Sequence, residues 1–375
     1  MSLGTAARYV TATLLFCSCG LDDRIGDARP VVVEHPIIEK ADTAGAVVLI
    51  KSSPEVNRLA TALERRRPVV SIGSIDSAET ALGNPVDIAV DESGNAHVLD
   101  AMFNEVRIFD EEGSYLRSVG RSGDGPLEMR YPVGLELLSD GTLVVGQSSG
   151  YTLIEQTADG FYEQRASIPV GAVPSPVSFC VTSGGIAQRS ASHIDNGIVT
   201  LLALDGTIRE RFGGSYVHGG IIVREDLSVG PIACSPGNVI AAYAHLPYID
   251  VFSLSGEREG RYVFPDFSLR RFEERSNGGN SPSSLRHIAS PGNLVLTAHT
   301  HPSNVAIIQV ASLGAADARG RQEIVGLATY AVDLLEKNGK LISTNLPHIL
   351  AMGVNWFWAR EEGGVGFPVV TKYSY

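Results

Sequence analysis

Three histidines in turn-rich stretches are the first candidates for ligand or metal chemistry in this chain: His245, His299 and His301. His299 and His301 are two residues apart, so an extended strand would direct both side chains to the same side. A metal site needs three or four ligands that converge at about 2 Å. The sequence near these histidines shows no local cluster that adds a carboxylate, so a divalent metal remains an alternative and no cofactor is the first expectation.

A second candidate is the segment Arg121–Tyr131, which contains Arg121, Arg130 and Tyr131. Its glycines Gly123 and Gly125 could present backbone N–H groups to an anion. The alternative is a tight connector between two sheets, and the glycine turns favour this. The G-x4-G-K-S/T phosphate loop and the G-x-S-x-G nucleophile elbow are both absent from the sequence, so neither nucleotide binding nor serine hydrolysis is indicated.

Two cysteines beyond the N-terminal region, Cys180 and Cys234, lie four and three residues before their turn glycines. Because side chains alternate along a strand, this difference of one residue would place the two thiols on opposite faces of their sheets. Disulfide geometry is demanding. Two buried free thiols are therefore expected in preference to a disulfide.

The composition limits the function classes. The 375-residue chain has a formal net charge of −12, 44% hydrophobic residues and 40 glycines. A negative balance of this kind argues against nucleic acid as a partner, because phosphate binding needs a basic surface. The apolar content is enough for a large core, and the glycine content indicates many turns.

Turns that recur at regular spacing are the strongest structural signal. The first series comprises Asp91–Gly94, Ser139–Gly141, Thr182–Gly184, Ser235–Gly237, Ser290–Gly292 and Met352–Gly353. The second comprises Glu111–Gly113, Ala158–Gly160, Leu204–Gly206, Leu254–Gly256 and Lys337–Gly339. The glycines of the first series are 47, 43, 53, 55 and 61 residues apart, with β-branched and aromatic runs between the turns. Four strands, a to d, repeated every ~40–50 residues predict the blades of a β-propeller.

The sequence predicts an all-β, six-bladed propeller with four-stranded blades. The last blade lacks a strand d, and Val69–Ile72 can supply it beside Val369–Tyr373, which would close the ring without exposed sheet edges. An insertion at 302–323 would explain the long fifth unit. A β-sandwich is the alternative fold, whereas the 19-residue spacing between most turn partners leaves no room for the helices of a parallel α/β sheet.

The N-terminal region predicts export. The uncharged stretch Tyr9–Phe16 is too short to span a bilayer and suits a secretory signal. Leu15–Cys19 is similar to a bacterial lipobox, which would make Cys19 the lipidated residue and a lipid anchor the only membrane contact. The expected domains are a signal peptide at 1–19, a tether with a short helix (Pro54–Arg67) at 20–67, and the propeller at 68–375. Plain secretion, with a periplasmic or extracellular product, and a cytosolic chain are the alternatives.

Residues 85–113 resemble an NHL repeat. The resemblance rests on Pro85–Asn95, Val98–Asp100 and Ile108–Gly113, and Gly120–Met129 is similar to the segment between blades in bacterial six-bladed propeller proteins, many of them lipoproteins. The chain departs from the repeat at Phe103–Val106, where an Asn-x-Arg pattern is usual, so the polar pairing of that turn is in doubt. The resemblance implies a fold and a binding surface, and no common reaction.

The face that carries the b-to-c loops and the d-to-a connections, here called the loop face, is where propellers usually bind ligands. We expect a non-catalytic recognition module of the cell envelope that binds a protein or a small polar ligand there. The candidate binding residues are Arg121, Arg130, Tyr131, His245, His299 and His301. A metal-dependent, lactonase-like hydrolase on the same fold and a structural envelope scaffold are the alternatives. Asp100, at the end of a strand b, is the candidate calcium ligand, whereas Trp356 and Trp358 are expected in the core.

Overall fold

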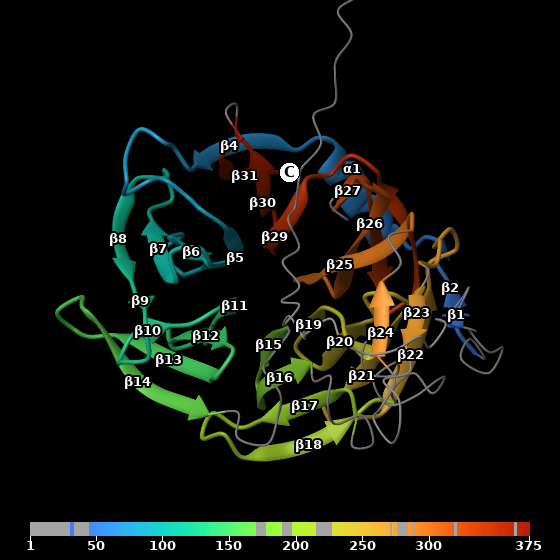
Figure 1. Cartoon of the computed structure of the whole chain (residues 1–375), viewed down its shortest axis with the longest axis horizontal. Helices are drawn as coiled ribbons and strands as arrows, with labels where there is room; N and C mark the ends of the chain where they lie inside the picture. The colour runs from blue at the N-terminus through green and yellow to red at the C-terminus, as the bar shows by residue number, and fades with distance from the viewer. Residues whose placement is uncertain are drawn as a thin grey trace, which may run out of the picture.

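Figure 1 shows a ring of small sheets around a central axis, in a computed structural model of the chain. The structure describes residues 31–33, 45–169, 178–189, 197–214, 227–270, 272–275, 284–287, 290–318, 321–363 and 366–375. The expected signal peptide and Cys19 lie outside these residues, and of the expected tether and short helix at 20–67 the structure describes 31–33 and 45–67.

Each of the six blades is an antiparallel sheet whose strands a to d run in order from the axis outward. Blade 1 is β5 (Pro85–Val90), β6 (Ala96–Asp100), β7 (Glu105–Phe109) and β8 (Tyr115–Val119). Blade 2 is β11 (Pro132–Leu137), β12 (Leu143–Gln147), β13 (Gly150–Gln156) and β14 (Tyr162–Pro169). Blade 3 is β15 (Phe179–Thr182), β16 (Gly185–Arg189), β17 (Val199–Leu202) and β18 (Ile208–Phe212). Blade 4 is β19 (Ile232–Cys234), β20 (Asn238–Ala242), β21 (Tyr248–Ser253) and β22 (Arg258–Val263).

Blade 5 has longer strands than the other blades. Blade 6 takes its strand d from the N-terminal side of the chain. Blade 5 is β25 (Gly292–His301), β26 (Val305–Ala316), β27 (Gln322–Asp333) and β28 (Asn338–Ser343). Blade 6 is β29 (His348–Met352), β30 (Trp356–Glu362), β31 (Pro368–Ser374) and, from the N-terminal side of the chain, β4 (Arg67–Ile72). Val370 pairs with Ile72 and Lys372 with Val70. The predicted closure of the ring is confirmed.

The two turn series join strands a to b and c to d as predicted in blades 1 to 4. At the c-to-d turns of these blades, Gly113, Gly160, Gly206 and Gly256 all have φ between 81° and 85°. A side chain at this φ would be strained, which is why glycine recurs there.

The core consists of apolar clusters between neighbouring blades. In the cluster between blades 6 and 1, Ile72 and the fully buried Trp358 pack against Ile88 and Phe109. Trp356 packs at its margin, so the expectation that both tryptophans belong to the core is confirmed. Because blades pack face to face, each blade depends on its neighbours for burial.

The segment from Val47 to Glu64 belongs to the ring. β2 (Val47–Val48) adds a fifth strand to blade 4, and β3 (Ile50–Lys51) adds one to blade 5. Helix α1 (Pro54–Glu64) follows, with the Ser53 hydroxyl accepting the Val56 N–H at its N-terminus. Its buried residues Val56, Leu59 and Leu63 contact blades 5 and 6. These residues form part of the propeller and not a separate tether.

Shorter elements lie in the connections between blades. β9 (Arg121–Ser122) and β10 (Glu128–Met129) pair between blades 1 and 2. β1 (Val31–Val33), β23 (Phe272–Arg275) and β24 (Ser284–His287) form a separate three-stranded sheet. Among the described residues, no helix has the length and apolar character that crossing a bilayer requires.

Residues 302–323 do not form an insertion. They contain the a-to-b turn of blade 5, strand β26 and the connection to β27. The expected a-to-b turn at Ser290–Gly292 is wrong, because this segment leads into β25, which begins at Gly292. The long spacing of the fifth unit reflects the length of β26 and β27, which have 12 residues each.

Cys180 and Cys234 form a disulfide, with Cα atoms 5.6 Å apart. The expectation of two free thiols was wrong. The cysteines are on the innermost strands of blades 3 and 4, β15 and β19. Neighbouring blades pack face to face, so a side chain on one face of blade 3 meets a side chain on the opposite face of blade 4. The one-residue difference that argued against pairing is what brings the thiols together.

Candidate recognition site

Exposed side chains occupy two segments of the loop face, the b-to-c turn of blade 1 and the start of blade 2. Tyr131 is 76% exposed, Met102 64%, Phe103 43% and Val133 38%. Met102 and Phe103 belong to the b-to-c turn of blade 1, whereas Tyr131 and Val133 lie at the start of strand a of blade 2. Together with Arg130, whose side chain is 57% exposed, these residues are called the blade 1–2 rim.

A hydrogen bond joins the two halves of the rim. The Tyr131 N–H donates to Oδ1 of Asn104, at 3.2 Å. Both residues have positive φ, 50° for Tyr131 and 55° for Asn104. This conformation is costly for residues other than glycine and persists only where the surroundings enforce it. The rim is therefore held in a defined shape.

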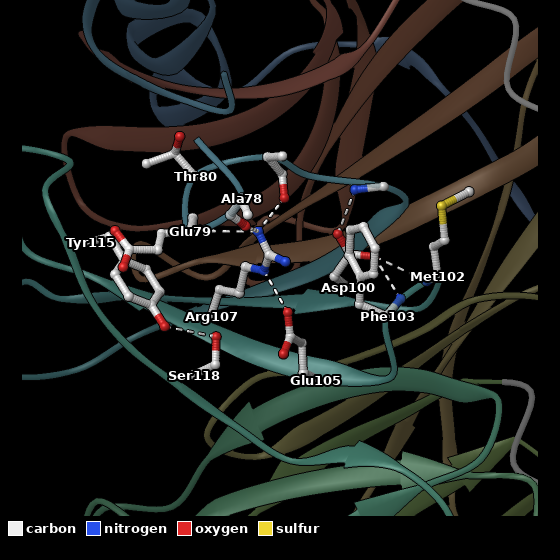
Figure 2. Close-up of polar contacts among 12 residues, drawn as sticks. Ala78, Glu79, Thr80, Asp100, Met102, Phe103, Glu105, Arg107, Tyr115 and Ser118 are labelled. Carbon is white, nitrogen blue, oxygen red and sulfur yellow. Dashed lines mark hydrogen bonds and ion pairs between the residues drawn. The ribbon is translucent and has the colours of Figure 1, made fainter. Parts of the chain in front are cut away.

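Asp100 fixes the b-to-c turn of blade 1 from below. Its carboxylate is fully buried and accepts the N–H groups of Gly83, Asn84, Met102 and Phe103 at 2.6–3.3 Å. Figure 2 shows the bonds from this carboxylate to the turn that holds Met102 and Phe103. With four backbone donors directed at it, Asp100 acts as a structural acceptor, and the geometry does not favour the calcium role considered above.

Arg107, on β7, supports the same turn from the other side. It is 6% exposed and donates to Glu105 Oε1 at 2.6 Å. Its Nη1 reaches the carbonyl oxygens of Ala78, Glu79 and Ala81 in the connection from blade 6 (Figure 2). Its guanidinium carbon lies 4.8 Å from the centre of the Phe103 ring. Arg107 therefore ties strand c to the connection from blade 6 by polar bonds and contacts the turn through the Phe103 ring.

In the connection between blades 1 and 2, the Glu128 carboxylate occupies the position where the backbone N–H of Gly125 could have bound an external anion. Glu128 accepts the Gly125 N–H at 2.7 Å and pairs with Arg121 at 2.8 Å. These contacts, the Gly125 N–H first, lower the pKa of Glu128. Arg130 pairs with Asp124 at 2.6 Å. The tight connector is the structure observed, and Arg121 and Arg130 keep exposed guanidinium edges on the loop face.

Two carboxyl groups lie between the innermost strands of blades 1 and 2. Asp87 accepts the Leu135 N–H at 2.8 Å, which ties β5 to β11. Burial raises the pKa of Asp87 to about 7. Burial, and then the charge of Asp87, raise the pKa of Glu136 to about 8. These groups bear on stability and do not reach the exposed rim.

The predicted histidines do not join the rim. His245 is in the b-to-c connection of blade 4, as expected, but its side chain is only 3% exposed. His299 is on β25, where its Nε2 lies 3.0 Å from the Ile349 carbonyl and burial lowers its pKa to about 4. His301 ends β25 at the opposite face, with Nδ1 2.6 Å from the Ser303 hydroxyl. The placement of His299 and His301 beside a b-to-c loop was wrong, because the a-to-b turn of blade 5 is at 302–304.

Sequence reasoning missed a buried charged cluster between blades 3 and 4. Arg261 pairs with Asp250 through two bonds of 2.6 Å, and the Tyr243 hydroxyl donates to the same carboxylate at 3.0 Å. Arg189 lies over the Tyr243 ring and donates to the Ser228 carbonyl. Their spacing in the sequence gives no signal for this cluster. Among the described residues, no group of three or more His, Cys, Asp or Glu side chains is arranged to hold a metal ion.

No protein-family model and no curated protein matches the chain by sequence. Solved structures match it by fold. A Bacteroides fragilis protein described as exported is 8% identical, over 88% of this chain and 98% of that one, with a TM-score of 0.53. A DUF4221 family member from Bacteroides vulgatus is 10% identical, over 82% and 98%, with a TM-score of 0.48. Virginiamycin B lyase from Staphylococcus aureus is 12% identical, over 83% and 98%, with a TM-score of 0.43. The chain is a six-bladed β-propeller, and at these identities the similarity extends to the fold alone.

Proposed function

We propose that this chain is a recognition propeller of the cell envelope, which binds a partner protein through the blade 1–2 rim. The observation that carries the proposal is the exposure of Tyr131, Met102 and Phe103 on two segments of the loop face that the Tyr131–Asn104 hydrogen bond joins. Tyrosine, phenylalanine, methionine and arginine are the residue types enriched at protein interfaces. Their gathering supports a protein partner over a small polar ligand.

The support of the rim favours recognition without a large conformational change. Asn104 and Asp100 hold the two segments of the rim by accepting backbone N–H groups, and Arg107 packs against the Phe103 ring while it binds carbonyl groups of the connection from blade 6. A rigid surface loses little conformational entropy on binding. The exposed Arg130–Asp124 pair at the margin of the rim can re-pair with a partner's charges, which favours partner selection more than affinity.

The rim is tested by binding measurements on variants. The chain, immobilised on beads, is incubated with envelope extract, and the amount of each retained protein is quantified. Tyr131→Ala and Arg130→Glu should reduce the amount of a specific partner by about tenfold or more, the loss expected for an interface hot spot. Leu335→Ala is the matched control, because Leu335 is 72% exposed in the c-to-d turn of blade 5, on the opposite face. Equal retention by all variants would contradict the proposal.

We propose further that the chain is exported and carries a lipid on Cys19, in keeping with its NHL-like, lipoprotein-like sequence. The Cys180–Cys234 disulfide supports export, because disulfides persist in oxidising compartments. The similar Bacteroides fragilis protein is described as exported. Labelled palmitate should be incorporated by the chain and lost in Cys19→Ser, and equal labelling would contradict lipidation.

A lactonase-like hydrolase has less support. Asp100, the candidate calcium ligand, is already engaged by four N–H groups. Metal content after exhaustive dialysis distinguishes the two functions, since one tightly held Ca²⁺ or Zn²⁺ per chain would favour the hydrolase. A structural scaffold would instead show no saturable partner and would tolerate alanine throughout the rim.

A further inference from the structure

Strand d of every blade carries a β-bulge, and the residue at the bulge differs between blades. The bulge leaves one residue of strand d unpaired with strand c. The bulged residues of blades 1 to 6 are Leu116, Arg165, Arg209, Glu259, Ile342 and Val69. Charged bulges, as in blades 2 to 4, protect exposed sheet edges from pairing with other chains. The other three bulges are apolar. β3 pairs with the outer edge of blade 5, whereas Leu116 in blade 1 and Val69 in blade 6 are 46% and 58% exposed.

A groove of about 430 Å³ lies beside Leu116, along the seam between the outer strands of blades 1 and 2. Leu127 and Tyr162 also line it, as does Phe161, which is 72% exposed. β8 is the last strand of its sheet, and no strand in the described part of the chain pairs with its outer edge. Unpaired backbone groups and exposed apolar side chains therefore occur together at this seam.

The chain itself shows how such a seam is filled. Between blades 4 and 5, the segment Val47–Lys51 runs across the outer edges, pairing first with β22 and then with β28. Leu49, in its middle, is 1% exposed and packs between the two blades against Tyr262 and Val332. Its N–H donates to the Val263 carbonyl at 2.9 Å. A five-residue extended segment with a central leucine is thus a natural occupant of an outer seam in this propeller.

We propose that the outer seam of blades 1 and 2 binds an extended segment of a partner protein in the same way, by strand addition to β8 with an apolar side chain inserted beside Leu116 and Phe161. Arg117 lies in the groove and donates to the Gly160 carbonyl with one nitrogen, Nη1. Its exposed guanidinium gives the seam a positive charge on a molecule whose net charge is −12. The segment therefore carries acidic residues at the ends of its apolar run. This surface is separate from the blade 1–2 rim.

The probe is a fluorescein-labelled peptide Asp-Val-Val-Leu-Ile-Asp, titrated with the full chain and followed by fluorescence anisotropy. We expect saturable binding that Leu116→Asp weakens by about tenfold or more, since the insertion of one apolar side chain is lost. Val69→Asp is the matched control, because Val69 is the bulged residue of blade 6 and is 58% exposed. It should leave binding unchanged. A peptide with lysine at both ends should bind more weakly.

Hydrogen exchange on the unmodified chain gives a second readout that needs no variant. The peptide should slow amide exchange over residues 115–119 and leave residues 67–72 unaffected. The proposal is overturned by an absence of saturable binding, by equal losses in Leu116→Asp and Val69→Asp, or by equal affinity for the lysine peptide. It is also overturned if sedimentation shows a dimer of this chain that Leu116→Asp dissociates, because the occupant would then be a second copy.

Discussion

Two buried side chains, Asp100 and Arg107, set the position of the blade 1–2 rim. Asp100 accepts four backbone N–H groups, and Arg107 binds three carbonyl groups of the connection from blade 6. Each bond alone contributes modestly, whereas a buried backbone group left without its partner costs about 1–3 kcal/mol. The position of the exposed residues Met102 and Phe103 therefore depends on two side chains that are themselves buried.

Arg107→Ala should lower the free energy of unfolding by about 2–4 kcal/mol, because it leaves Glu105 and the carbonyl groups without their donor. Urea unfolding followed by circular dichroism measures the loss. Arg107→Lys should be intermediate, since one ammonium cannot reach Glu105 and the carbonyl groups together. The exposed Arg130→Ala should change stability by no more than about 0.5 kcal/mol. Similar unfolding curves for Arg107→Ala and Arg130→Ala would contradict this role.

The sequence located part of the rim and missed the rest for identifiable reasons. Arg130 and Tyr131 were found because a connector between blades must lie on the loop face, and the structure places both there. Met102 and Phe103 were missed, although apolar residues in a predicted turn were a usable signal. His299 and His301 were misplaced because Ser290–Gly292 has the composition of an a-to-b turn but precedes the strand. Ligand contact by His299, His301, Arg121 and His245 stays a prediction.

At the scale of elements, the innermost strands carry groups whose protonation differs between the folded and unfolded chain. Asp87 and Glu136 have a raised pKa, about 7 and 8, so the folded chain still holds protons that the unfolded chain has lost. Their contribution to stability is therefore present at low pH and is lost as the pH rises through 7 and 8. His299 and His348 have a pKa lowered to about 4, so their effect is opposite, and stability is lost as the pH falls from about 6.5 towards 4.

Thermal unfolding at several pH values tests this linkage. Stability should decline between about pH 6.5 and 8, above the range in which the two histidines offset the two carboxyl groups, with a slope of at most about 1.4 kcal/mol per pH unit for each titrating proton. Glu136→Gln should flatten the decline, because its side chain has no proton to lose in this range. Glu163→Gln, on the exposed edge of β14, serves as the control and should keep the slope of the unaltered chain. An unchanged slope in Glu136→Gln would show that this carboxyl does not titrate as described.

The Cys180–Cys234 disulfide acts between two elements, the innermost strands of blades 3 and 4. It closes a loop of 54 residues, for which chain entropy predicts a stabilisation of about 4 kcal/mol, with a usual range of about 2–5. The Cys180→Ser, Cys234→Ser double variant should unfold at lower urea concentration by a corresponding amount. Reducing agent should shift the unaltered chain towards the variant and leave the variant unchanged. Equal stability of the two proteins without reductant would rule out a stabilising disulfide.

At the scale of the whole molecule, the ring depends on a strand from near the chain start. Ile72, on β4, is 2% exposed in the cluster between blades 6 and 1, whereas Val69 on the same strand is 58% exposed. Ile72→Asp should destabilise the chain by about 3–5 kcal/mol, because it buries an unpaired charge where the ring closes. Val69→Asp should have an effect within about 0.5 kcal/mol. If denaturant unfolding gave both variants the same stability, β4 would not be an essential part of the closure.

The architecture was largely predictable because turn glycines and strand runs repeat at a period that few folds share. The blade count, the order of strands and the closing pair of Val370 with Ile72 follow from that repetition. The cysteine pairing, the fifth strands β2 and β3 and the cluster around Arg189 do not, because they depend on how one blade faces the next. Contacts between neighbouring blades produce no periodic pattern in the sequence, so they cannot be predicted from a single sequence.

Site-specific photocrosslinking tests recognition by the blade 1–2 rim most directly. A benzophenone amino acid is placed at Tyr131 in one chain and at Leu335, on the opposite face, in another, and both are irradiated in envelope extract. Recognition by the rim requires a discrete adduct from position 131 alone, which excess unlabelled chain suppresses and excess Arg130→Glu chain does not. A matching adduct from position 335, or none from position 131, would contradict it.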